Sequence, residues 1–200
     1  MTMKLYHFPV APNPARVLFY IKEKGLTDIE LVLVDFFKGE QNSDAHLARS
    51  PQGVVPVLEL ADGRCFTESL AIIEYLEERF PQPPLIGSTA EQRLQTRSME
   101  RMIEMTLLVP VMRLVHATRS PLGLPPNPAV AEQEQSRLPV RLHRLNEQLQ
   151  QGPFVLGERV SIADCTLLAA YNFAQLGQLD LFADYPALRR WVDHYALRHL

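Results

Sequence analysis

Gly53-Val54-Val55-Pro56-Val57-Leu58 places a proline directly before an apolar, strand-like run. A proline at the entrance of a strand that must still pair often follows a cis peptide bond, so we predict that Pro56 is cis. The main-chain N–H and C=O of Val55 would then be available to an extended peptide. The stretch therefore predicts a strand with a ligand site beside its first residues.

The residues that follow this stretch predict a hairpin and a helix. Val54 to Leu60 and Arg64 to Phe66 are strand-like runs on either side of Asp62-Gly63, a common hairpin turn. Ser69 to Phe80 then carries apolar residues at helical spacing. The order of elements here is strand, strand, helix.

The residues that precede it predict a parallel pair of strands. Lys4 to Phe8 and Ile29 to Val34 are rich in β-branched and apolar residues, and Pro14 to Lys24 between them is helix-like. A proline in the first turn and Gly25 just past the last turn suit the two helix ends. Strand, helix and strand in this order predict a parallel pair with a right-handed crossover. A polar stretch, Lys38 to Ser50, separates this βαβ half from the ββα half.

A proline-rich segment separates two parts of the chain. Residues 81–84 contain three prolines, which makes the segment too stiff to continue a helix. All strand-like segments and all four lysines precede it. We therefore predict a first domain over residues 1–80, a linker over 81–88 and a second domain over 89–200.

The second domain is predicted to be an all-helical bundle. Its predicted helices are Glu91–Thr118, Ala129–Gln150, Ile162–Leu176 and Pro186–Leu200, with a loop at residues 121–128, which contain four prolines. Ser161 and Asp164 have the spacing of a capping box at the start of the third helix. This pattern is structural, and Cys165 beside it is predicted to be a buried apolar residue.

Composition and charge exclude several classes of protein. The 200 residues are 46% hydrophobic and 22% charged, with a net charge of −3, as in a soluble globular protein. The absence of a basic run argues against nucleic acid as a partner. Apolar stretches far shorter than about 20 residues, and no signal-peptide core, argue against a membrane and export. Two distant cysteines and scattered histidines predict neither a disulfide nor a metal site, and a cytoplasmic location is expected.

Three features of the first domain are predicted to meet at one end of the sheet. The turn from Pro9 to Arg16 enters a helix whose N-terminal amides and positive dipole end favour an anion such as a thiolate. Val55-Pro56 offers main-chain groups to an extended peptide. Glu68-Ser69 begins another helix, where a hydroxyl and amides can hold a carboxylate. Together they predict a ligand site.

These residues resemble a known family. Residues 53–58 followed by Thr67-Glu68-Ser69-Leu70-Ala71-Ile72-Ile73-Glu74-Tyr75-Leu76 resemble the glutathione-binding half of the soluble (cytosolic) glutathione S-transferases, bacterial type. Val160-Ser161-Ile162-Ala163-Asp164 resembles a capping segment of their second half. The resemblance implies an α/β N-terminal thioredoxin-like domain followed by an all-α helical-bundle domain. It also implies a cytosolic homodimer, a role in detoxification, and glutathione as cosubstrate with no metal.

The resemblance assigns roles to individual residues. Val55, before a cis Pro56, would pair its backbone with the cysteinyl unit of glutathione, and Glu68 with Ser69 would hold the γ-glutamyl end. The glutathione thiol would be joined to a small hydrophobic electrophile. The candidate residues for the electrophile site are Phe8, Pro9, Val10, Met105 and Met112.

Two positions depart from the family pattern. Ala11 stands where the family places its thiol-activating serine, cysteine or tyrosine, and the nearest replacement is Asn13, whose side-chain NH₂ can donate to a thiolate. Asn13 before a proline also fits the N-cap of the first helix, so both roles stay open. Val54 stands where the family more often has a basic or amide side chain that reaches the glycine carboxylate. That role is open to Arg49 or His46.

These departures leave three candidate functions. The leading one is a glutathione transferase, with Asn13 as the catalytic residue. Ala11 also fits a non-catalytic glutathione-binding or regulatory protein of the same fold. A glutathione-dependent disulfide reductase is the third, although residues 11–14 lack the two cysteines of a dithiol mechanism.

Three further expectations concern residues around the site and between subunits. Arg16 is expected to pair with a nearby carboxylate, and Tyr6 and His7 are expected to be packing residues rather than a general acid or base. We predict a homodimer in which residues 69–80 pack on the first helices of the second domain. The apolar residues that motivate this dimer are Ile72, Ile73, Met99, Met102 and Ile103.

Overall fold

Four short strands form one sheet in the order β2-β1-β3-β4. They are β1 (Met3–His7), β2 (Ile29–Leu33), β3 (Val57–Glu59) and β4 (Cys65–Phe66). β1 and β2 are parallel, β3 is antiparallel to β1, and β4 is antiparallel to β3. The predicted parallel pair and the predicted hairpin at Asp62-Gly63 are confirmed.

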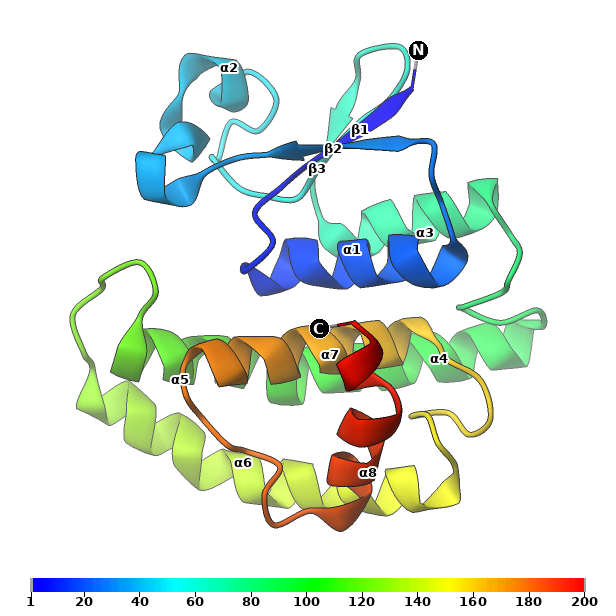
Figure 1. The fold of residues 1–200 in the computed structure, drawn as a ribbon, viewed down its shortest axis with the longest axis vertical. Helices are drawn as coiled ribbons and strands as arrows, with labels where there is room; N and C mark the ends of the chain where they lie inside the picture. The colour runs from blue at the N-terminus through cyan, green and yellow to red at the C-terminus, as the bar shows by residue number, and fades with distance from the viewer. Residues whose placement is uncertain (1, 200) are drawn as a thin grey trace. The chain divides into compact units, whose positions relative to one another are not determined.

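The structure is a computed structural model that describes residues 2–199 (Figure 1). The chain divides into two units, Met1–Pro83 and Pro84–Leu200. The sheet belongs to the first unit, and the second unit is helical. A thioredoxin-like α/β unit followed by a helical unit confirms the predicted fold class.

Besides two 3₁₀ turns, Phe36–Lys38 and Glu40–Asn42, the described part of the first unit contains three α-helices. They are α1 (Pro12–Lys24), α2 (Asp44–Leu47) and α3 (Ser69–Arg79). α1 and α3 lie side by side along one face of the sheet, and α2 lies beyond the other face (Figure 1). Successive side chains of a strand point to opposite faces. Leu5 is therefore in the core with Val17 of α1 and Ile73 of α3, all three fully buried, while Tyr6 belongs to a smaller apolar cluster.

Lys24, the last residue of α1, anchors the end of this unit. Its Nζ donates to the carbonyl oxygens of Phe80 and Pro83 at 2.5 and 2.6 Å and lies 2.7 Å from Glu77 Oε2. The side chain has no exposed surface. Three oxygen partners compensate for the loss of hydration, which a buried ammonium requires. Lys24 thereby ties the C-terminal end of α3 and the start of the proline-rich segment to α1.

Besides two 3₁₀ turns, Leu149–Gln151 and Ala196–Arg198, the described part of the second unit contains five α-helices and one π-helical segment. These are α4 (Ala90–Ile103), the π-helical residues Glu104–Leu108, α5 (Val109–Arg119), α6 (Pro128–Gln148), α7 (Ile162–Leu176) and α8 (Pro186–His194). The bounds of α7 are those predicted from the sequence. The predicted last helix, Pro186–Leu200, is instead interrupted at Tyr195 and followed by a 3₁₀ turn, Ala196–Arg198, and its final residue, Leu200, lies outside the described residues.

The predicted helix Glu91–Thr118 contains a break in its hydrogen-bond pattern. Residues 104–108 form a π-helical turn, and Pro110 follows within the first turn of α5. A proline has no N–H to give to the carbonyl four residues earlier, here that of Thr106. Arg141 Nη1, from α6, donates to the Thr106 carbonyl oxygen at 3.0 Å instead. The helix therefore continues through a proline because a neighbouring helix replaces the missing donor.

The predicted capping box at the start of α7 is present, and Asp164 does more than cap. Its carboxylate accepts from the Ser161 amide and the Val155 amide, each at 2.9 Å, and from Trp191 Nε1 at 3.0 Å. Asp164 is fully buried, as is Cys165, in agreement with the prediction. The cap thus joins the loop before α7, the helix itself and α8.

Candidate functional site

The start of α1, which follows β1 after a short connecting turn, forms the first part of the site. The helix starts at Pro12, with Ala11 as N-cap and no side-chain capping bond. Asn13 is therefore the second helical residue, and the interpretation of Asn13 as N-cap is wrong. The cause is Pro12, whose fixed φ suits the first helical position as well as that of Pro14 does.

The two prolines give the first turn of α1 an unusual set of donors. Pro12 and Pro14 have no N–H, and the Ala11 N–H donates to the Phe8 carbonyl oxygen at 3.0 Å. Within residues 2–199, the Asn13 N–H is the amide of this first turn that lacks a main-chain acceptor. It points from the positive end of the helix dipole, where an anion is stabilised.

A loop before β3 forms the second part. The Val55–Pro56 peptide bond is cis, as predicted. Both main-chain groups of Val54 are occupied: its N–H donates to Ser50 Oγ at 3.0 Å, and its carbonyl oxygen accepts from His46 Nε2 at 3.1 Å. The next residue differs, because no described residue bonds to the N–H or C=O of Val55. Val55 is the residue expected to pair with a peptide-like ligand.

The start of α3 forms the third part. Glu68 is exposed and has a positive φ of 69°, a conformation that is costly for a residue with a Cβ. Such strain is characteristic of functional sites. Ser69, the first residue of α3, is 3% exposed, and the amides of this first turn face the same end of the helix.

Arg16 links the first and third parts. Its Nε donates to Ser69 Oγ at 2.8 Å, and its Nη2 donates to Asn13 Oδ1 at 3.3 Å. The arginine is itself buried, with 3% of its surface exposed. Both partners are neutral oxygens, and the carboxylate partner expected for Arg16 from the sequence stays a prediction. The contact with Asn13 was not predicted, although a spacing of three residues on one helix is a signal for it; nothing in the sequence indicates the contact with Ser69, 53 residues away.

The predicted electrophile residues of the first unit adjoin this site. Phe8 is buried and stacks on Phe36 with ring centroids 5.1 Å apart, while Pro9 and Val10 are exposed in the turn before α1. Phe37 packs its edge on Phe8 at 5.3 Å and is 68% exposed. The two phenylalanines after β2 were not predicted, because they fall in a stretch with no helical or strand periodicity.

The methionines assigned to the electrophile site belong to the second unit. Met105 lies in the π-helical turn and is 50% exposed, and Met112, in α5, is half-buried. Both are therefore accessible to a ligand at the surface of their own unit.

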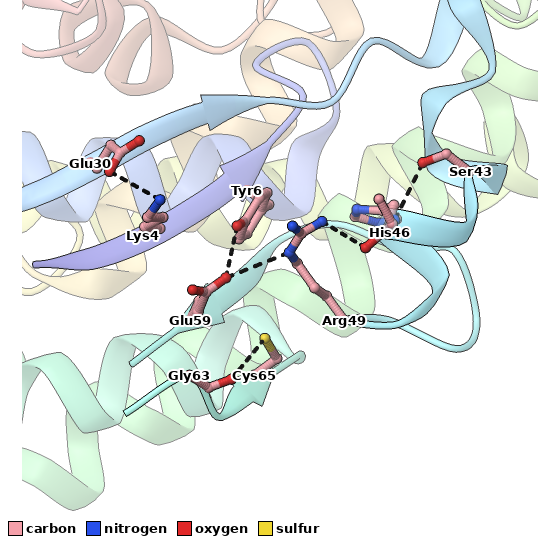
Figure 2. Close-up of polar contacts among 10 residues, drawn as sticks. Lys4, Tyr6, Glu30, Ser43, His46, Arg49, Glu59, Gly63 and Cys65 are labelled. Atoms are coloured by element: carbon pink, nitrogen blue, oxygen red, sulfur yellow. Dashed lines mark hydrogen bonds and ion pairs between the residues drawn. The ribbon is translucent and has the colours of Figure 1, made fainter. Parts of the chain in front are cut away.

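Arg49, one of the two candidates to replace the family's basic residue, lies on the outer face of the sheet. Its guanidinium stacks over the Tyr6 ring at 4.5 Å, and its Nε lies 3.5 Å from Glu59 Oε2 (Figure 2). Tyr6 donates to the same carboxylate oxygen at 2.7 Å. Burial, reinforced by this bond, raises the pKa of Tyr6 to about 12, so the phenol stays protonated at neutral pH. Tyr6, Arg49 and Glu59 thus hold one another in place on this face of the sheet.

His46 is held by a hydrogen bond to the loop before β3, and His7 is half-buried. His46 is 3% exposed and its Nε2 is committed to the Val54 carbonyl, so it positions the loop from within. Burial lowers the pKa of His7, which keeps that ring neutral at physiological pH.

Two structural features are absent from residues 2–199, a metal-binding cluster and a membrane-spanning helix. They contain no group of three or more His, Cys, Asp or Glu side chains that could hold a metal ion. None of the helices in this range is both long and apolar enough to cross a membrane.

Comparison with known proteins identifies the class to which this fold and site belong. The family model "Glutathione S-transferase, N-terminal domain" matches residues 5–84, and "Glutathione S-transferase, C-terminal domain" matches residues 102–198. Glutathione S-transferase 2 of Saccharomyces cerevisiae is 32% identical over 201 residues, which cover 98% of this chain and 86% of the yeast protein.

Solved structures agree with this result. The crystal structure of Gtt2 from Saccharomyces cerevisiae has a TM-score of 0.85 at 31% identity, covering 98% of this chain and 95% of that one. A glutathione S-transferase domain-containing protein of Marinobacter aquaeolei has a TM-score of 0.87 at 33% identity, covering 98% of both chains. The chain belongs to the glutathione S-transferase family.

Proposed function

We propose that this chain is a transferase that joins the thiol of glutathione to a hydrophobic electrophile. Glutathione is an anionic, extended tripeptide, and each part of the site suits one of its features. Val55, with its free main-chain groups beside Pro56, pairs with the cysteinyl unit. Glu68 and Ser69, at the start of α3, hold the γ-glutamyl end through the Ser69 hydroxyl and the helix amides.

The main support for this proposal is that Asn13 presents two hydrogen-bond donors at the start of α1. Its main-chain N–H has no acceptor among residues 2–199, and its side-chain NH₂ lies at the same end of the helix. Lowering a thiol pKa from about 8.5 to near 7 requires about 2 kcal/mol. A helix N-terminus with two donors supplies a stabilisation of this size, which allows Asn13 to serve in place of the usual hydroxyl.

The electrophile is proposed to lie against the turn before α1. Pro9 and Val10 are exposed in this turn, and the exposed ring of Phe37 packs on the buried Phe8, so together they present an apolar surface next to the start of α1. Met105 and Met112, the other residues that the sequence suggested for the electrophile, are accessible on their own unit, and methionine side chains adapt to apolar ligands of different shapes.

Steady-state kinetics combined with calorimetry tests this function. We expect turnover of glutathione with a chlorinated nitroaromatic, no turnover with a small disulfide, and measurable affinity for glutathione. Binding without turnover of either substrate would favour the non-catalytic glutathione-binding protein, which the alanine at position 11 also fits. Turnover of the disulfide alone would favour a glutathione-dependent reductase.

A cytoplasmic homodimer is the proposed setting, with detoxification as its role. Three of the apolar residues that motivated the dimer, Ile72, Ile73 and Ile103, are buried within the chain and leave no face for a partner. Phe66 and Tyr75 are exposed instead, at the rim of a cavity of about 230 Å³ between β4 and α3. We propose that this surface of the first unit contributes to self-association.

A further inference from the structure

Arg16 determines which atoms Asn13 and Ser69 can offer to a ligand. A guanidinium has five N–H donors and no acceptor. The Asn13 atom that faces Arg16 Nη2 must therefore be the carbonyl oxygen, and the amide NH₂ must point the other way. The same argument applies to Ser69, whose Oγ accepts from Arg16 Nε and must direct its own hydrogen elsewhere.

The two bonds are made by one rigid, buried group. Nε and Nη2 belong to the same planar guanidinium, so its orientation fixes both contacts together. Neither the Asn13 NH₂ nor the Ser69 hydroxyl hydrogen has an acceptor among residues 2–199. Both donors are left for a ligand.

We propose that Arg16 is a positioning residue that orients the thiol-side donor and the carboxylate-side donor of the glutathione site at once. This inference rests on the proposed function, because it assigns the glutathione thiol to Asn13 and the γ-glutamyl carboxylate to Ser69. Arg16 acts through these two side chains and need not touch the ligand.

The proposal makes an unusual prediction about substitutions. Asn13→Ala should raise the pKa of the bound thiol with little effect on glutathione affinity. Ser69→Ala should weaken glutathione affinity with little effect on the thiol pKa. Arg16→Lys keeps the charge but loses the planar guanidinium. It should therefore raise the thiol pKa by about 0.5 to 1 unit and also weaken glutathione affinity by about fivefold to tenfold. In the background Asn13→Ala with Ser69→Ala, the same arginine substitution should have little further effect.

Thiolate absorbance of bound glutathione against pH, together with calorimetry, measures both quantities. Arg64→Lys is the matched control, because Arg64 contacts Asp62 through Nε and Nη2 in the hairpin turn, at the opposite end of β4 from Glu68. It should leave both quantities unchanged. The proposal is overturned if Arg16→Lys lowers the melting temperature alone. It is also overturned if Arg16→Lys changes the thiol pKa and the affinity as much in the double-alanine background as in the wild type.

A second variant covers the case in which Arg16→Lys does not fold. Asn13→Asp keeps an oxygen toward Arg16 and removes the NH₂, so we expect a melting temperature at or above that of the wild type and a raised thiol pKa. An unchanged thiol pKa in this variant would contradict the assigned orientation. If the wild type binds no glutathione at all, the proposed function fails as well; if it binds and only these variants disagree, the role of Arg16 alone is rejected.

Discussion

Asn13 is the proposed replacement for the hydroxyl or thiol that Ala11 lacks, and its role is open to direct measurement. Asn13→Ala should raise the pKa of the bound glutathione thiol and reduce turnover, because the lost bond favours only the ionised sulfur. Ala11→Ser should act in the opposite direction by restoring a hydroxyl. Identical thiolate titration curves for the wild type and both variants would exclude Asn13 from catalysis.

His46 supports the binding loop from behind, and its contribution should be separable from that of Asn13. His46→Ala removes the donor to the Val54 carbonyl, which should weaken glutathione binding by about 1 kcal/mol while the thiol pKa stays the same. His46→Gln, which can still donate, should recover part of the affinity. His143→Ala, on the exposed face of α6, is the control. Calorimetry that finds equal affinities for folded His46→Ala and wild type would refute this support.

Single residues of the site differ in how well the sequence predicts them. The cis bond at Val55–Pro56 follows from a proline before a strand, and the position of Ser69 follows from the start of a helix. The link through Arg16 could not be predicted, because it joins residues 53 positions apart and depends on how α1 and α3 pack. Sequence periodicity identifies the helices but not the side chains that meet across them.

At the level of elements, the sequence predicts types better than ends. β3 is shorter than the predicted Val54–Leu60, because Val54 bonds to Ser50 and His46 rather than to a strand. The polar stretch Lys38–Ser50 contains two 3₁₀ turns and α2, each too short for a periodic pattern. The π-helical turn before Pro110 could not be predicted from the sequence either, because Arg141, which donates to the Thr106 carbonyl oxygen, comes from another helix.

The cap of α7 should be the most sensitive polar group of the second unit. Asp164→Ala leaves the Val155 amide and Trp191 Nε1 buried without acceptors, which should lower the free energy of unfolding by about 3 kcal/mol or more. Asp184→Ala, at an exposed position, should cost less than about 0.5 kcal/mol. Urea unfolding followed by the fluorescence of Trp191, the chain's single tryptophan, reports on this unit. Similar midpoints for the two variants would show that the cap is not needed.

At the scale of the whole molecule, we expect a dimer in solution. Replacing the exposed Phe66 and Tyr75 together by serine should shift the sedimentation mass toward that of one chain, 22.8 kDa, because the contact would lose its apolar core. Leu31→Ser, at an exposed position on the other edge of the sheet, should leave the mass unchanged. A wild-type mass of one chain at micromolar concentration would remove the basis for this prediction.

The buried ammonium of Lys24 gives the molecule a built-in reporter for covalent labelling. All four lysine side chains precede residue 39, so an amine-reactive reagent modifies no side chain of the second unit. Lys22 is exposed one half-turn away, whereas Lys24 reacts only when its contacts with Phe80, Pro83 and Glu77 open. If that opening costs about 3 kcal/mol, mass spectrometry should find Lys24 acetylated about 100-fold more slowly than Lys22. The ratio of the two rates then measures how often the end of the first unit detaches in the native protein, and equal rates would mean that the anchor is open most of the time.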